Sequence, residues 1–200
     1  MATREPTKPR SERPFAALHR DRWRSHMKNP SSQVALLTEC GRATQRRFLA
    51  DIATVMDTLV SNMCLRTRKI GSAQRNGFFL FTWQTIADKS GLPLWRVKQC
   101  AIRAIDNGWL ESTQPRDTRT GESNRREWVC LASIKRITFK YLTVMGLKDA
   151  FSAAHQAAAK ALKLKSERWN KPVKYLLTPI TLLAKFRRAK QQLRAAAPPN

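Results

Sequence analysis

Acidic residues are scarce in this sequence, which has 14 Asp or Glu among 200 residues against 38 Lys or Arg. The formal net charge is therefore +24. A compact domain with so large an excess of one sign repels itself, and nucleic acid is the most common polyanionic partner for such a domain. An anionic membrane surface is the main rival partner.

Long apolar runs are also missing. The longest candidate, residues 175–186, is interrupted by Thr178, Pro179, Thr181 and Lys185, whereas a spanning helix needs about 18 or more apolar residues. The basic N-terminus is not followed by the apolar segment of a signal peptide. We therefore expect a cytoplasmic protein that neither crosses a membrane nor is secreted.

Cysteine and glycine occur without the spacings that chemistry requires. Cys40, Cys64, Cys100 and Cys130 are 24, 36 and 30 residues apart, and none belongs to a Cys-x-x-Cys pair. We interpret them as reduced thiols. The seven glycines form no phosphate-binding motif, so we expect no nucleotide cofactor, no metal and no enzymatic activity.

Composition divides the chain into three parts. Residues 1–31 contain eight Lys or Arg and four Pro but few large apolar groups, which predicts a disordered basic N-terminal arm. Such an arm either solubilises the protein or reaches along DNA. Residues 42–145 have the patterning of a folded domain. Residues 146–200 form a basic C-terminal region, in which we expect two helices separated by a link near Pro172.

Within the folded domain, apolar residues at helical spacing predict a long amphipathic helix from about Ala43 to Cys64. Its aspartates, Asp51 and Asp57, are expected on the solvated face. The Gly71 to Gly77 segment is expected to be a loop, and residues 78–81 a short strand.

Two shorter helices follow. Thr82 is a plausible N-cap for a helix over 83–90, Gly91 supplies a turn, and a second helix runs over 94–107. Strands over 109–113 and 127–131 are expected to pair as a hairpin with a long basic tip. The predicted fold class is thus α+β, mainly helical.

This order of elements is that of a winged helix-turn-helix domain. Ala87, Gly91 and Val97 have the spacing of the small residue, the turn glycine and the buried branched residue in a helix-turn-helix. The helix beginning at Leu94 is then the recognition helix, with an inward face made of Val97, Cys100, Ala101, Ala104 and Ile105.

The expected DNA-binding residues lie on the outer side of this helix and on the hairpin tip. They are Trp95, Arg96, Lys98, Gln99, Arg103, Arg116, Arg119, Arg125 and Arg126. Gln99 suits adenine, and Lys98 or Arg96 suits guanine. The tip arginines suit phosphates or a flanking minor groove. Trp95 either faces DNA or covers an edge of the domain.

The stretch from Phe78 to about Leu164 resembles the replication initiators of FII-type plasmids. The resemblance is carried by the helix-turn-helix over 85–105, the Asn107-Gly108-Trp109-Leu110 exit, the charged tip with Gly121, Ile137-Thr138, and Leu142 to Leu147 before a basic Ala-rich helix. It spans less than half of the chain and is one of order and spacing more than of identity.

The resemblance implies a bacterial, DNA-associated initiator that binds a plasmid origin and recruits host replication proteins, such as a helicase or its loader. A homodimer is an open alternative to a monomer. A winged-helix transcriptional repressor would have the same sequence features.

A rolling-circle nickase, which needs a tyrosine nucleophile and metal-binding histidines, is disfavoured. Tyr141 and Tyr175 are the only tyrosines, and His19, His26 and His155 form no His-x-His pair. An RNA-binding or membrane-surface protein stays open because the expected last helix, over 181–197, is basic and amphipathic.

Overall fold

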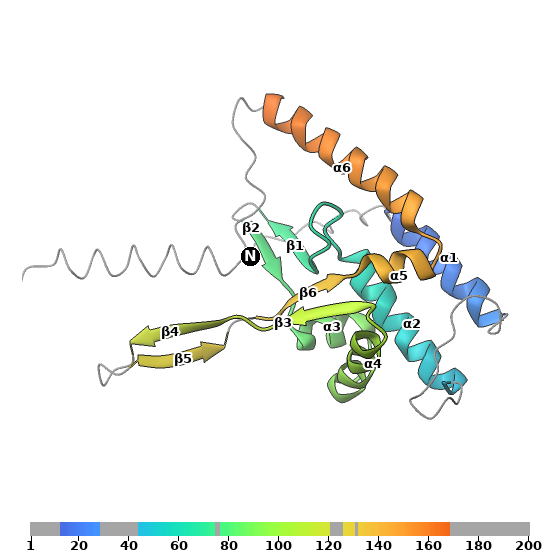
Figure 1. Ribbon diagram of the computed structural model, residues 1–200, viewed down its shortest axis with the longest axis horizontal. Coiled ribbons are helices and arrows are strands. Elements are labelled where there is room, and N and C mark those ends of the chain that lie inside the picture. Colours follow the sequence, from blue (N-terminus) through green and yellow to red (C-terminus); the bar gives the residue numbers. More distant parts are fainter. Residues whose placement is uncertain (1–12, 29–43, 75–76, 121–125, 131, 169–200) are drawn as a thin grey trace, which may run out of the picture.

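The computed structural model describes residues 13–28, 44–74, 77–120, 126–130 and 132–168. The protein is mainly helical, with small antiparallel sheets (Figure 1). The helices are α1 (Pro14–Lys28), α2 (Arg46–Ser61), α3 (Trp83–Ser90), α4 (Leu94–Asp106), α5 (Phe139–Val144) and α6 (Lys148–Arg168). The strands are β1 (Gly71–Gln74), β2 (Gly77–Leu80), β3 (Leu110–Thr113), β4 (Arg116–Thr120), β5 (Arg126–Cys130) and β6 (Ile134–Ile137).

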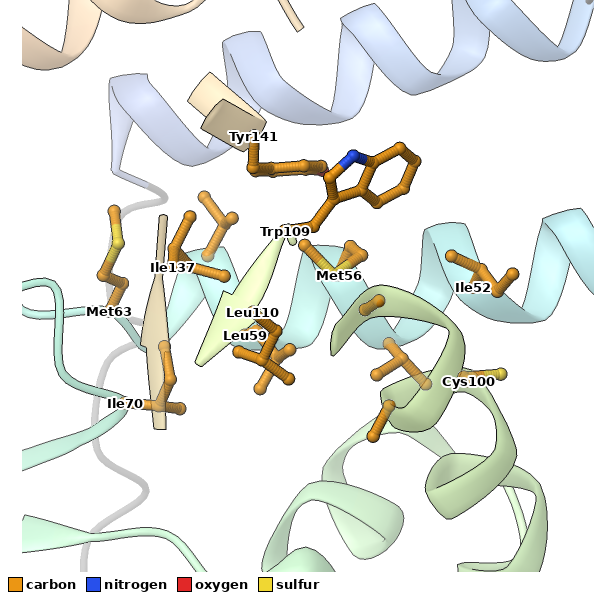
Figure 2. Close-up of a cluster of buried hydrophobic side chains, with 14 of the residues drawn as sticks. Ile52, Met56, Leu59, Met63, Ile70, Cys100, Trp109, Leu110, Ile137 and Tyr141 are labelled. Carbon is orange, nitrogen blue, oxygen red and sulfur yellow. The ribbon is translucent and has the colours of Figure 1, made fainter. Parts of the chain in front are cut away.

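Helix α2 runs through the middle of the core, and α1, α3 and α4 pack against it. Ile52, Met56 and Leu59 are fully buried at the spacing of one helix face. Figure 2 shows them between α4 on one side and Trp109 and Tyr141 on the other. The predicted amphipathic helix is confirmed in its position and in its buried face.

The α3-turn-α4 unit follows the local sequence signals. The Thr82 side chain accepts a hydrogen bond from the Thr85 backbone N–H at 3.1 Å and so caps α3. Gly91 ends α3 with a φ of 69°, in the left-handed region that glycine adopts without strain. Ala87 and Val97 are buried where the two helices pack together. The cap, the turn and both helices are confirmed.

Strand β6 is bonded along both of its edges. On one edge it pairs with β3 in antiparallel register, with Leu110 opposite Ile137. On the other edge the Ile70 N–H donates to the Lys135 carbonyl oxygen at 3.0 Å, and the backbones of Lys69 and Arg136 form an isolated antiparallel β-bridge. No pairing was predicted for this segment, which follows α2 and precedes β1. It joins the chain after α2 to the paired strands β3 and β6.

The predicted loop over 71–77 is wrong for its first half, because Gly71–Gln74 forms β1 and pairs with β2. The chain changes partner at Gly71, from β6 before it to β2 after it. A Cβ on Gly71 would lie 2.1 Å from the Phe79 carbonyl oxygen. Only glycine lets the two backbones approach this closely. The predicted strand near 78–81 is confirmed as β2.

The predicted hairpin is present with different pairing. β3 pairs with β6, and not with residues 127–131, while β4 pairs with β5 farther out. We call β3·β6 the root and β4·β5 the ribbon. Figure 1 shows the ribbon projecting away from the helices. Much of the expected polar tip is therefore strand, because the segment after Pro115 resumes pairing instead of looping.

The prediction of a disordered arm over 1–31 is wrong for residues 14–28, which form α1. This helix packs against α2 and α6, with Phe15, Ala16, His19, Trp23 and His26 buried. These five positions share one helix face. The arm prediction failed because it relied on the high charge and proline content and overlooked this apolar and aromatic stripe.

Helix α5 ends the predicted folded domain, and α6 follows at the start of the C-terminal region. Thr138 caps α5, and Phe151 of α6 is buried against Phe15 of α1, with ring centroids 5.8 Å apart. The first of the two helices expected in this region, from about Leu147 to Lys165, is confirmed as α6. The link near Pro172 and the helix over 181–197 lie outside the described residues. In the described part of the chain, no helix has both the length and the apolar character needed to cross a bilayer.

Candidate nucleic-acid interface

Helix α4 has one buried face and one exposed face. Val97, Cys100, Ala101 and Ala104 are buried against the core, and burial raises the pKa of the Cys100 thiol to about 11. The opposite side carries residues with exposed side chains. They are Trp95, Lys98, Gln99, Ile102, Ile105 and Asp106.

One apolar residue of α4 departs from the expected arrangement, and a second is exposed beside it. Ile105 was expected to face inward but is 40% exposed, and Ile102 is 59% exposed. Trp95 is 60% exposed, so most of its side chain faces solvent. The outer face of α4 therefore combines a cation, an amide and the carboxylate of Asp106 with large apolar groups. Such apolar groups can contact thymine methyl groups, and the amide and ammonium can contact base edges.

Arg96 is held by neighbouring side chains. Its Nε donates to Oδ2 of Asp51 on α2 at 2.7 Å, and its guanidinium carbon lies 4.5 Å from the centre of the Phe48 ring. A terminal nitrogen donates to Oε1 of Gln99 at 3.1 Å. Asp51, expected on a solvated face, is thus bound to α4. Arg96 therefore links α2 to the exposed face of α4, and its side chain does not extend freely into solvent.

Lys98 and Arg103 differ in their exposure. Lys98 is exposed on the outer face of α4, whereas Arg103 is half-buried. A half-buried guanidinium reaches outward less readily than an exposed ammonium. Lys98 is therefore the most accessible cation among the predicted α4 residues.

The predicted hairpin arginines are distributed over the ribbon. Arg116 is exposed at the start of β4, and Arg119 is also in β4. Arg126 begins β5 and pairs with Thr120. Arg125 lies outside the described residues. Three of the four predicted tip arginines are therefore in paired strand, so their backbones have a fixed register.

The root of the hairpin contains a buried lysine that the sequence interpretation missed. The ammonium of Lys135 donates to the Phe81 carbonyl oxygen at 2.7 Å and to Ser133 Oγ at 2.7 Å. It also lies 4.4 Å from the centre of the Trp83 ring. Burial lowers the pKa of Lys135 to about 8. This contact joins β6 to the start of α3, and so orients the root relative to the helix-turn-helix. The sequence feature that could have revealed this contact is a lysine at a position of β6 that faces the core.

On the opposite side of α2, a polar network fastens α1. The hydroxyl of Tyr141 accepts a hydrogen bond from Trp23 Nε1 at 2.8 Å and lies 2.6 Å from His19 Nε2. His19 Nδ1 is 3.7 Å from Oδ1 of Asp57. Arg20 also donates to Asp57. Asp57 was expected on the solvated face; this expectation is wrong because its partners on α1 lie far away in the sequence.

This network has consequences for titration and for chemistry. Burial would raise the pKa of the Asp57 carboxyl, but its interactions with the nearby His19 and Arg20 side chains hold the pKa below its ordinary value. Burial raises the pKa of the Tyr141 hydroxyl well above its ordinary value. Tyr141 is fully buried, so its oxygen is out of reach of a DNA phosphate in this structure.

The predicted site residues are thus brought together in part. Trp95, Lys98 and Gln99 share an exposed face, and Arg96 supports that face. Arg116, Arg119 and Arg126 lie on the ribbon. Within the described segments, no group of three or more His, Cys, Asp or Glu is placed to hold a metal ion.

Comparison of the chain with protein-family models, with curated proteins and with solved structures found no match. The similarity of residues 78–164 to plasmid initiators remains a prediction from the sequence.

Proposed function

We propose that the protein binds double-stranded DNA through a winged helix-turn-helix, and that it initiates plasmid replication without enzymatic activity. In this proposal α4 enters the major groove and the ribbon acts as the wing. The bound DNA is the plasmid origin in the bacterial cytoplasm, where the protein recruits host replication factors.

The exposed face of α4 is the observation that carries the proposal. A helix buried on one side by Val97 and Ala101 presents Lys98, Gln99 and Trp95 together on the other side. A helix of this width fits the major groove, where amide and ammonium groups meet the donors and acceptors of base edges. The partly apolar character of this face argues for a specific contact rather than a merely solubilising one.

The arrangement around α4 supports a winged helix. α2, α3 and α4 pack together, and the chain then enters an antiparallel hairpin whose β6 strand is bonded on its second edge by the segment before β1. The β1·β2 hairpin is an addition between α2 and α3. Basic residues on the ribbon suit phosphate or minor-groove contacts, which position a protein more than they select a sequence.

The role in replication rests on the resemblance of residues 78–164 to FII-type plasmid initiators. The Asn107 to Leu110 exit leads into β3, and Ile137-Thr138 leads into α5, in the order that the resemblance implies. Origin opening and recruitment of a helicase or its loader come from this resemblance alone.

A transcriptional repressor is the alternative, because it would use the same face of α4. A genetic experiment separates the two. A plasmid that carries only the gene and its adjacent DNA replicates if the protein is an initiator, and fails to replicate if it is a repressor.

Footprinting on the DNA that flanks the gene tests DNA binding itself. We expect a protected site whose affinity falls steeply with salt, by ~10³ to 10⁵-fold between 50 and 200 mM for six to ten phosphate contacts. Lys98→Ala and Gln99→Ala should weaken the footprint or change its sequence preference. Lys160→Ala is the matched control, since Lys160 is exposed on α6, on the far side of α2 from α4 (Figure 1).

Three results would contradict the proposal. A flat salt response excludes a phosphate-dominated interface. An unchanged footprint with both α4 variants excludes α4 as the reading helix. Stronger binding to RNA or to anionic vesicles than to duplex DNA would show that the excess positive charge of the protein serves another partner.

A further inference from the structure

Among the residues that the structure describes, only one end of the exposed Gln99 amide has a hydrogen-bond partner. Its Oε1 accepts the hydrogen bond from Arg96 at 3.1 Å, while the same guanidinium is bound by Asp51 at 2.7 Å and lies over the Phe48 ring. Asp51 and Arg96 are only 21% and 22% exposed. Because two groups of α2 and one of α4 contact it, the guanidinium has little freedom to move away from Gln99.

The chemistry of arginine decides which way this amide points. A guanidinium has only N–H donors, so the group of Gln99 that faces Arg96 must be the carbonyl oxygen. The Nε2 amino group is then at the other end of the amide, on the exposed face of α4. The surface thus presents two N–H donors, with the acceptor turned toward Arg96.

We propose that Asp51 and Arg96 are positioning residues that make Gln99 a hydrogen-bond donor, and that Gln99 therefore selects guanine. This inference rests on the proposed binding of duplex DNA by α4. Guanine presents two acceptors, O6 and N7, and no donor in the major groove. Adenine, the usual partner of glutamine, needs the oxygen and the nitrogen of the amide together. The interaction with Arg96 removes the oxygen from that pairing.

Arg96 itself makes no base contact in this arrangement. Its expected role as a reader of guanine is replaced by an indirect one, in which it fixes the orientation of a neighbouring side chain. Lys98 remains the direct cationic reader on the same face.

In vitro selection from a pool of randomised DNA duplexes tests the proposal with the full-length protein. The base pair read by Gln99 is the position whose preference disappears in Gln99→Ala. We expect the wild-type protein to select guanine there, by on the order of tenfold over adenine, which is within the range of one good base contact.

Two variants then test whether Arg96 orients the Gln99 amide or only supports the fold. Arg96→Lys keeps a cation beside Asp51 but lacks the planar fork that bonds both neighbours. It should release the amide and shift the preference at that position from guanine toward adenine. Gln99→Glu should select cytosine, because a carboxylate only accepts and cytosine presents an amino donor. A purely structural role for Arg96 would weaken binding to all sequences equally.

The thermal unfolding of each variant, followed by circular dichroism, checks that it is folded. Asp51→Asn is the second test of the same connection, because it removes the charge that holds Arg96 and should shift the preference in the same direction as Arg96→Lys. Selection of adenine by the wild-type protein, or an unchanged preference in folded Arg96→Lys, overturns the inference while leaving the proposed function intact. Absence of any sequence-selective duplex binding overturns the proposed function as well.

Discussion

Helices α1 and α4 lie on two sides of α2 and use tryptophan in opposite ways. Trp23 of α1 is 3% exposed, and its indole N–H is bonded to Tyr141. Trp95 of α4 is 60% exposed, and no hydrogen bond to its indole N–H occurs within the described residues. Both helices are basic and both have an apolar stripe, so composition alone does not distinguish them.

The difference shows what a buried polar network adds. On α1, the aromatic stripe is fixed by hydrogen bonds that converge on the Tyr141 hydroxyl. On α4, the fixed polar contacts are made by Arg96, and they leave the exposed face open. Helix α1 therefore contributes to stability, whereas α4 keeps an exposed face, which our proposal assigns to recognition.

The largest effect expected is on stability, from Trp23→Ala. Removal of a buried indole leaves a cavity between α1, Trp109 and Tyr141 and should lower the free energy of unfolding by ~3–5 kcal/mol. Urea denaturation followed by circular dichroism measures this change. A loss below about 1 kcal/mol would mean that α1 is not an integral part of the core.

Tyr141→Phe should have the next largest effect on stability. The ring is kept, but Trp23 Nε1 and His19 Nε2 lose their shared partner, and unsatisfied buried polar groups cost about 1–3 kcal/mol. Denaturation of the variant beside Trp23→Ala and the double variant would show non-additive losses, because both changes break the same contact. Additive losses would contradict the network.

Acidification should weaken the packing of α1 against the core more than it weakens the packing of α4. His26 is buried, neither of its ring nitrogens has a partner among the described residues, and burial lowers its pKa. The unfolded state therefore takes up the proton first, and stability should fall as the pH drops below about 6.5. Asp57, whose pKa is also lowered, should cause a further loss near and below about pH 4.

Unfolding curves of the wild type and of His26→Phe between pH 7 and pH 5 check this dependence. The variant has no titrating ring, so its stability should change less with pH in this window. Parallel curves would show that His26 is not the group responsible.

The smallest effect on stability is expected from Trp95→Ala, the counterpart of Trp23→Ala. An exposed side chain contributes within about 0.5 kcal/mol, so the unfolding curve should be nearly unchanged. The affinity for the selected duplex should nevertheless fall, because the indole belongs to the face that the proposal places against DNA. Equal stability losses for the two tryptophan variants would remove the contrast between α1 and α4.

Local signals made the helix-turn-helix predictable from the sequence. The Thr82 cap, the Gly91 turn and the apolar spacing of α2 and α4 each act within a few residues. For the same reason the buried face of α4 was predictable, apart from Ile105 at its end.

What the sequence did not predict depends on distant partners. His19 and Tyr141 are 122 residues apart, and Arg96 and Asp51 are 45 residues apart. The pairing of Lys69 with Arg136 is likewise non-local. No periodicity marks such contacts, so α1 was interpreted as a tail, Arg96 as a free reader, and β3 as paired with the wrong strand.

In the proposed complex with duplex DNA, the length of the ribbon limits how far the protein reaches from the root of the hairpin. β4 pairs five residues with β5, which at ~3.4 Å per residue is a reach of about 17 Å beyond the root. One turn of B-form DNA rises about 34 Å, so this reach corresponds to half a turn. In the proposed complex, with α4 in a major groove, a ribbon that runs along the duplex reaches toward the neighbouring minor groove on the same side. The proposal therefore makes the spacing between the two contacts depend on strand length.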